Sequence, residues 1–212
     1  MKSILLRISL GAIFYTFIHA GSCQNEHPLA LQRDEIPPDQ LAEVFKPLDG
    51  TWKGKFTVYS DQNGQNKGNS QPKIEDKTYL DKLDLKIEAV IDVTQVYTSD
   101  SPTYQRVHIT DVYTDANGNR QEVKSEGYNA VENGKLICVV NKPDEKVVHD
   151  GIAYPGQIIV WGRNESNPTK VEYFFEKVEA NTYSILGWGY YGNDDPELSP
   201  KTWFYGAYKR QQ

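Results

Sequence analysis

The chain has 212 residues, with 29 acidic and 23 basic side chains and a formal net charge of −6. The acidic excess, without any basic stripe along the sequence, argues against a nucleic-acid partner. Two cysteines are too few for a disulfide framework, and the sequence lacks G-x-S-x-G, H-E-x-x-H, Cys/His clusters and phosphate-binding glycine loops. These absences favour a non-catalytic protein and predict no metal site.

Residues 1–22 have the pattern of a secretory signal peptide. Lys2 and Arg7 give a basic start, an apolar run follows over residues 8–18, and the small residues Ala20-Gly21-Ser22 come next. The apolar run is too short to span a bilayer, which needs ~20 apolar residues. Without this segment the chain has a formal net charge of −8, because the segment carries two basic and no acidic side chains.

Cys23 directly follows these small residues and is one of only two cysteines. The arrangement resembles the lipobox of bacterial lipoproteins, in which the cysteine becomes the first mature residue and its thiol takes a diacylglycerol. Ala20 stands where that family usually has Leu. The resemblance implies an exported, membrane-anchored lipoprotein of the cell envelope, on the periplasmic or outer-membrane side, with residues 23–38 as a polar tether. The alternative is an ordinary signal cut and a secreted soluble protein.

Residues 39–212 are long enough for one domain with a sizeable core, and no change in composition divides them. Residues 39–48 (DQLAEVFKPL) place four apolar side chains at helical spacing. This spacing predicts a short N-terminal helix, which Pro47 limits in length.

The remaining sequence alternates between apolar and polar residues, which is typical of antiparallel strands with one buried face. Asn117-Gly118 and Asn133-Gly134 separate such runs and are strong hairpin signals, because both central residues of the turn need positive φ. Residues 83–97 form a run long enough to require a bend or a β-bulge. The predicted strands cover residues 50–60, 83–97, 104–115, 119–131, 135–140, 157–163, 169–178, 182–191 and 202–210.

No helix of crossover length lies between these runs, which excludes parallel β-α-β units. The sequence predicts an all-β fold, a single antiparallel up-and-down β-barrel of about eight to ten strands, because closure removes exposed strand edges. A β-sandwich is the alternative. It would need Greek-key crossings, for which only the predicted loops 61–76 and 143–156 are long enough.

Gly50-Thr51-Trp52 opens the first strand after the predicted helix. It resembles the G-x-W signature of lipocalins and their calycin relatives. The second lipocalin signature, T-D-Y in a late loop, is missing, so the resemblance is to a calycin-like barrel. It implies that Trp52 closes one end of the barrel and that Arg210, at the end of the last strand, packs across its ring as a cation–π pair.

Aromatic residues concentrate in the late strands and favour a ligand site, since a barrel of this size can hold one small ligand in its mouth. The predicted ligand-binding aromatic residues are Trp161, Tyr173, Phe175, Trp188 and Tyr190. Glycines in "GWGYYG" (187–192) allow either close approach of a ligand or relief of crowding beside large rings.

Arg106 and His108 alternate on one face of their strand. They complete the predicted ligand site if that face points inward, and lie in solvent if it points outward. His149 falls in a predicted loop that would cover the barrel mouth. Cys138, within an apolar run, is expected to be a buried free thiol, with a disulfide to Cys23 as the alternative.

The leading hypothesis is an exported, lipid-anchored barrel that binds a small apolar or aromatic ligand without catalysis. One alternative is a barrel that binds haem as its cofactor, or an enzymatic barrel, and that uses His108 or His149. Another is a structural or interaction protein of the cell envelope whose barrel is solid. An exposed aromatic patch, rather than a lined pocket, would mark that last case.

Overall fold

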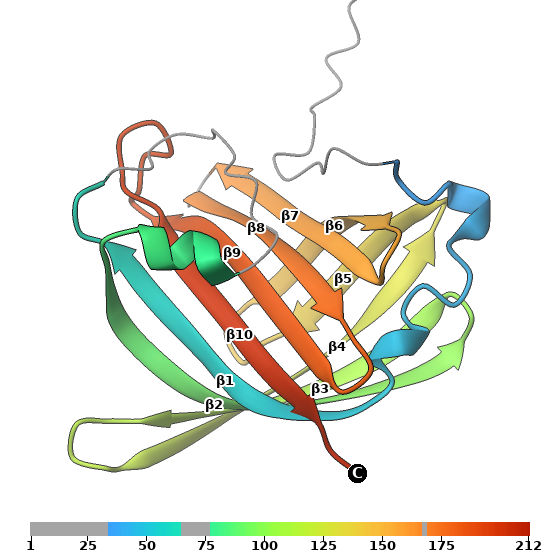
Figure 1. Cartoon of the computed structure of the whole chain (residues 1–212), viewed down its shortest axis with the longest axis horizontal. Coiled ribbons are helices and arrows are strands. Elements are labelled where there is room, and N and C mark those ends of the chain that lie inside the picture. Colours follow the sequence, from blue (N-terminus) through green and yellow to red (C-terminus); the bar gives the residue numbers. More distant parts are fainter. Residues whose placement is uncertain (1–33, 65–76, 167–168) are drawn as a thin grey trace, which may run out of the picture.

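The structure is a computed structural model that describes residues 34–64, 77–166 and 169–212. Ten β-strands form one closed barrel in which sequence neighbours pair antiparallel and β1 pairs with β10 (Figure 1). The predicted all-β, up-and-down antiparallel barrel is therefore confirmed, and the β-sandwich is excluded. The predicted signal peptide, Cys23 and most of the predicted tether lie outside the described residues.

The strands are β1 (Gly50–Asp61), β2 (Leu85–Ser101), β3 (Tyr104–Thr114), β4 (Arg120–Glu132), β5 (Lys135–Asn141), β6 (Lys146–Tyr154), β7 (Ile158–Ser166), β8 (Thr169–Val178), β9 (Thr182–Gly192) and β10 (Thr202–Arg210). Three short 3₁₀ helices accompany them: η1 (Pro38–Gln40), η2 (Lys46–Leu48) and η3 (Lys77–Lys82).

The prediction of one short helix over residues 39–48 is wrong, because the segment does not form a continuous helix. The segment forms two separate 3₁₀ turns, η1 and η2, with a turn between them. Glu43 adopts φ 64°, a left-handed conformation that interrupts a right-handed helix. The apolar residues of the pattern are nevertheless buried as expected, with Leu41 4 %, Phe45 2 % and Leu48 2 % exposed.

Strand β6 occupies residues that the sequence indicated as a loop, so the predicted loop 143–156 is wrong for most of its length. Its inward positions include His149 and Gly151, which do not score as apolar and hide the alternation. Gly151 is required there because a Cβ atom would lie 2.5 Å from the ring of Trp161.

The long second strand carries the expected β-bulge. In the pairing of β1 with β2, Val58 lies opposite Ala89 and Tyr59 lies opposite Ile87, which leaves one extra residue in β2. A bulge of this kind bends the strand and increases its twist. It lets a strand of 17 residues curve around the barrel.

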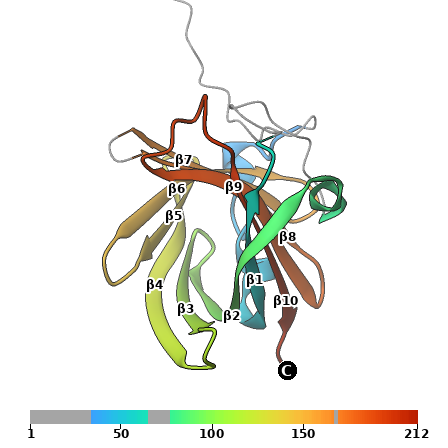
Figure 2. The same cartoon turned by 90° about the vertical axis from the view of Figure 1, so that its left-hand side faces the viewer.

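The barrel wall has apolar residues on both faces. Inside, one cluster surrounds Trp52 and another surrounds Trp161. Outside, a third cluster covers β7 to β10 and includes Trp188 and Trp203. Leu80 of η3 belongs to this outer cluster, and both views show η3 lying against the outside of the barrel (Figures 1 and 2). Part of the apolar core of this protein is therefore external to the barrel.

Candidate functional site

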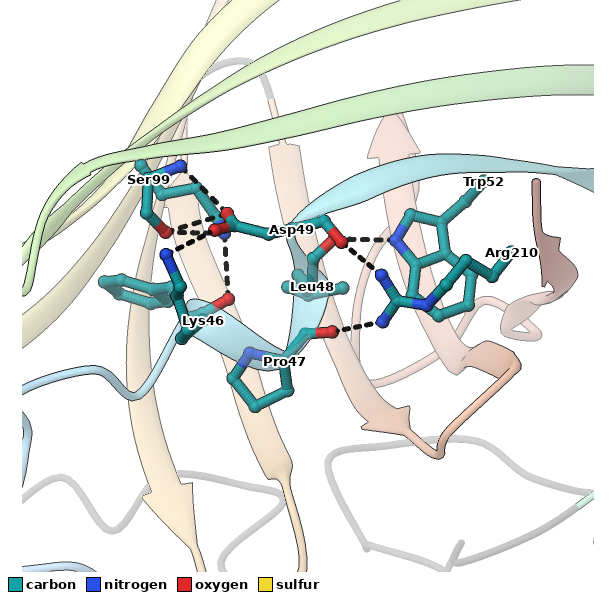
Figure 3. Close-up of polar contacts among 9 residues, drawn as sticks. Lys46, Pro47, Leu48, Asp49, Trp52, Ser99 and Arg210 are labelled. Carbon is teal, nitrogen blue, oxygen red and sulfur yellow. Dashed lines mark hydrogen bonds and ion pairs between the residues drawn. The ribbon is translucent and has the colours of Figure 1, made fainter. Parts of the chain in front are cut away.

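One end of the barrel is closed by Trp52 and Arg210 (Figure 3). The Trp52 side chain is fully buried, and its Nε1–H donates to the Leu48 carbonyl at 2.7 Å. The Arg210 guanidinium carbon lies 4.2 Å from the centroid of the Trp52 ring. Its Nη2 donates to the Pro47 carbonyl at 2.7 Å, and its Nη1 donates to the Asp49 carbonyl. The contact that the calycin resemblance implied is thus present.

The Asp49 carboxylate ties the same closed end to β2 and β3. Its Oδ1 accepts from the Ser99 amide at 2.8 Å, from the Ser99 hydroxyl at 2.8 Å and from Gln105 Nε2 at 2.9 Å. Lys46 forms an ion pair with Oδ2 at 3.0 Å. Burial opposes ionisation, but the hydrogen bonds from Gln105 and Ser99 outweigh it and lower the pKa of Asp49.

The interior is less completely packed away from Trp52. Strand pairing places Phe56, Ile109, Val140 and Phe174 on the inward face of their strands. All four side chains keep accessible surface although they point into the barrel. Phe174 reaches across to Phe204, with ring centroids 6.2 Å apart. These residues supply an apolar wall with surface left for contact.

A charged group of inward side chains lies on the wall formed by β6 to β9. Glu172 Oε2 lies 2.7 Å from Arg163 Nε and 3.0 Å from His149 Nε2. Tyr191 donates its hydroxyl to Glu172 Oε1 at 2.7 Å. Arg163 also donates through Nη1 to Glu145 at 2.7 Å. Every partner of Glu172 is thus a donor or a cation.

These contacts decide the charge of Glu172. Burial disfavours its ionised form, but the hydrogen bond and charge of His149 and the charge of Arg163 outweigh that effect and lower its pKa to about 2. Glu172 is therefore ionised at neutral pH and can only accept hydrogen bonds. It follows that His149 Nε2 carries the hydrogen of their contact. In the neutral imidazole, Nδ1 is then an acceptor.

Three buried polar atoms facing the interior have no hydrogen-bond partner among the described residues. They are His149 Nδ1, Arg163 Nε and the Tyr208 hydroxyl. Arg163 Nε is nevertheless in ion-pair contact with Glu172, which leaves His149 Nδ1 and the Tyr208 hydroxyl as the candidates for contact with a ligand. The His149 side chain is 8 % exposed and meets the ring of Phe174 edge-on at 5.2 Å. Leaving a buried donor or acceptor unpaired costs about 1–3 kcal/mol, so such atoms indicate a place for a bound polar group.

Four of the five predicted ligand-binding aromatic residues come together, but on the outer face of the barrel wall. Trp161 points inward and donates its Nε1–H to Glu176. Tyr173, Phe175, Trp188 and Tyr190 lie on the opposite face of the wall, in the outer cluster beside Trp203. The rings of Tyr173 and Trp188 are 5.0 Å apart there. The sequence could not indicate that the apolar face of β8 and β9 points out of the barrel.

The glycines of "GWGYYG" serve packing of the wall. A Cβ at Gly187 would lie 2.3 Å from the Tyr173 carbonyl oxygen, and one at Gly189 would lie 2.5 Å from the Tyr191 hydroxyl. Gly189 thereby leaves room for the hydroxyl group that hydrogen-bonds Glu172. Relief of crowding, rather than approach of a ligand, accounts for both positions.

Arg106 and His108 are exposed on the outer face of β3. Arg106 pairs with Asp100, with Nε 2.6 Å from Oδ2. His149 is a strand residue inside the barrel, not a loop residue. Since His108 faces solvent and His149 Nε2 is held by Glu172, neither offers a free Nε2 to a haem iron inside the barrel. Within the described ranges, these two histidines therefore do not fit a haem site inside the barrel.

A metal-binding cluster and a membrane-spanning helix are both absent from the described ranges. No group of three or more His, Cys, Asp or Glu side chains there has an arrangement that would hold a metal ion. No helix in that part of the chain is both long and apolar enough to cross a membrane. Cys138 is a free thiol on the inward face of β5, and burial raises its pKa.

The charged wall group was missed in the sequence. The only signal is that Lys170, Glu172 and Glu176 share one face of β8, opposite Val171, Tyr173 and Phe175. Phe174 and Val178 interrupt the polar face, so the alternation alone does not show that the glutamates point inward.

Neither a known protein family nor a curated protein matches the sequence. Among solved structures, the fold is similar to the crystal structure of Rv2717c from M. tuberculosis, with a TM-score of 0.51 and 13 % identity over 81 % of this chain and 99 % of that one. A redesigned β-barrel matches over 81 % of this chain and 98 % of its own, with 12 % identity and a TM-score of 0.36. The likeness to the first extends to the fold alone.

Proposed function

We propose that the protein binds a small, largely apolar ligand in the interior of the barrel. The observation that carries this proposal is that His149 Nδ1 and the Tyr208 hydroxyl are buried in the barrel interior, where no other described residue hydrogen-bonds them, together with half-buried apolar side chains. An apolar body would cover Phe56, Ile109 and Phe174. A polar group on that body would satisfy one of the two unpaired atoms.

The chemistry of His149 narrows the ligand class. Because Nε2 donates to the Glu172 carboxylate, Nδ1 accepts when the ring is neutral and donates when the ring is protonated. A ligand hydroxyl matches both states, because it can donate or accept. We therefore propose an aromatic or aliphatic ligand with one hydroxyl group, bound without covalent chemistry. Each such hydrogen bond contributes about 1 kcal/mol net, and the apolar contact supplies the rest.

Calorimetric titration with 1-naphthol tests this proposal, because that probe joins an apolar ring system to one hydroxyl donor. Ile109→Trp should fill the interior and weaken binding by at least about tenfold. His108→Trp is the matched control, since it adds the same side chain at the next residue of β3 but on the exposed outer face. Its affinity should stay within about twofold of the wild type.

The 1-methoxynaphthalene analogue keeps the rings and lacks the donor. It should bind roughly fivefold more weakly than 1-naphthol if a ligand hydrogen bond is made. Equal affinity of Ile109→Trp and the wild type for 1-naphthol would contradict the proposal. Absence of binding to the wild type would instead favour the structural or interaction role of a solid barrel.

We further propose that the protein is exported and anchored through a diacylated Cys23, on the sequence pattern of residues 1–23. The intact mass of protein extracted from the membrane fraction of a bacterial host tests this. A diacylglycerol increment on a chain that starts at Cys23 is the expected result. A Cys23→Ser variant should lack the increment and leave the membrane fraction, and an unmodified wild-type chain would overturn the anchor.

A further inference from the structure

A pocket of about 150 Å³ lies at the closed end, between the 36–48 segment and the turn that joins β6 to β7. Its lining is mostly apolar and includes Ile36, Val44, Pro47, Tyr154, Ile158 and the side chain of Glu176. This volume accommodates a single ring, since an engineered cavity of about 150 Å³ binds benzene. The pocket is separate from the apolar and charged walls described above.

The edges of this pocket hold strained backbone. Among the described residues, three that are not glycine have positive φ: Glu43 at 64°, Asn133 at 52° and Gln157 at 59°. Asn133 belongs to an Asn-Gly hairpin turn, where such a conformation is ordinary. Glu43 and Gln157 both line the pocket, from opposite segments. Each costs about 1–2 kcal/mol, and residues held in this way cluster at ligand sites.

Tertiary hydrogen bonds hold both strained residues in place. The Glu43 amide donates to the Pro102 carbonyl at 2.7 Å, and the Gln157 carbonyl accepts from the Val178 amide at 3.1 Å. The shape of the pocket is therefore fixed by contacts with β8 and with the β2–β3 turn. Preorganised walls lower the entropy cost of binding.

Glu176 is the polar group of this pocket and is 4 % exposed. Its Oε2 accepts from Trp161 Nε1, and its Oε1 is hydrogen-bonded to the Tyr183 hydroxyl. The Tyr183 hydroxyl oxygen is 3.3 Å from that of Tyr97, which donates to Gln95 Oε1 at 3.2 Å. A continuous chain of buried polar groups thus runs from Gln95 to Glu176.

Glu176 is the acceptor at the end of this chain. The Tyr183 hydroxyl donates to its Oε1, and the Trp161 indole N–H donates to its Oε2. Burial raises the pKa of Glu176, although these two hydrogen bonds act in the opposite direction. Its Oε2, which accepts from Trp161, retains one lone pair.

We propose that this pocket is a second binding site, specific for a small neutral ring that carries one hydroxyl or N–H group, which donates to Glu176. The apolar lining favours the ring and the volume excludes larger bodies. The Glu176 carboxyl group accepts one hydrogen bond from the ligand through the remaining lone pair of Oε2. The proposal does not depend on the barrel-interior site.

Phenol is the probe, titrated by calorimetry into the full chain, with anisole as the analogue that lacks the donor. The titrations use the Ile109→Trp background, so that binding inside the barrel does not contribute. Phenol should bind roughly fivefold more tightly than anisole. In this background, Val44→Trp should fill the pocket and weaken phenol binding by at least about tenfold. The single variant Val44→Trp, without Ile109→Trp, should bind 1-naphthol with an affinity within about twofold of the wild type.

Glu176→Gln is the matched variant for the carboxyl group, because an amide has nearly the same size and keeps one acceptor oxygen. It should keep phenol affinity within about twofold, whereas Glu176→Leu should lose the preference for phenol over anisole. If Glu176→Leu fails to fold, the phenol affinities with and without Val44→Trp still test the proposal. Equal phenol affinity of the proteins with and without Val44→Trp would overturn it. So would absence of phenol binding, including the case in which another part of the chain occupies the pocket.

Discussion

The two ends of the interior differ in how completely their polar groups are paired. At the Trp52 end, the indole N–H, the Arg210 guanidinium and the Asp49 carboxylate all have protein partners. Along the wall beside Glu172, His149 Nδ1 is buried and has no hydrogen-bond partner in the described part of the chain, and the same holds for the Tyr208 hydroxyl across the barrel. Polar groups whose hydrogen bonds are all made within the protein stabilise the fold, whereas unpaired ones can still bind a ligand. We therefore expect the first region to carry stability and the proposed ligand to contact the second.

The largest effect on this comparison is expected from Trp52→Ala. It removes a fully buried ring and the partner of Arg210, and should lower the free energy of unfolding by about 3–5 kcal/mol. Denaturant unfolding measures this. His108→Ala, an exposed residue of β3, is the control and should change stability by less than about 0.5 kcal/mol. A loss below 1 kcal/mol for Trp52→Ala would show that the closed end does not carry stability.

The pH dependence of the free energy of unfolding tests the role of Glu172 in the charged group of β6 to β9. Since the folded-state pKa of Glu172 is about 2, below the ordinary 4.5, its ionised form is favoured by folding. Its contribution is present above about pH 4.5 and is lost as the pH falls towards 2, by up to about 3 kcal/mol. Unfolding measured between these pH values should show a flatter dependence for Glu172→Gln. Identical slopes for the two proteins would remove Glu172 as the cause.

Arg210→Lys should have an intermediate effect. Lysine keeps the positive charge but cannot donate to the Pro47 and Asp49 carbonyls in the geometry of a planar guanidinium. We expect a loss of about 1–2 kcal/mol in the free energy of unfolding. Lys209→Arg, on the neighbouring exposed position, is the control. Unchanged stability of Arg210→Lys would mean that charge alone supports the closed end.

Tyr208→Phe should change the free energy of unfolding least among these variants. It is also the variant for which stability and ligand affinity should differ most in their response. No described residue hydrogen-bonds its hydroxyl, so removal of the hydroxyl should leave the free energy of unfolding unchanged or raise it by up to about 1 kcal/mol. The affinity for 1-naphthol should fall roughly fivefold if the ligand contacts this group. Tyr104→Phe, at an exposed position, should alter neither quantity. A destabilised Tyr208→Phe protein with unchanged binding would reverse the assignment.

The barrel itself follows from local signals in the sequence. Asn133-Gly134 joins β4 to β5 as expected, and the long run over residues 83–97 contains the expected bulge. The direction of each face does not follow from such signals. Alternation shows that Tyr173 and Glu172 lie on opposite sides of a strand, but only tertiary packing shows which side is inside. Here η3 covers the aromatic side, and the glutamates point inward.

The closing pair of strands has a kinetic consequence. Each of the other strand pairs joins neighbours in the sequence, whereas Arg210 and Pro47 are 163 positions apart. Bringing such distant segments together costs on the order of 4–5 kcal/mol of chain entropy. The β1–β10 contact should therefore form late in folding. Until it forms, the sheet has two free edges that can pair with other chains. Weakening the Arg210 contacts should therefore raise the fraction of chains that aggregate during refolding, even where the loss in the free energy of unfolding is small.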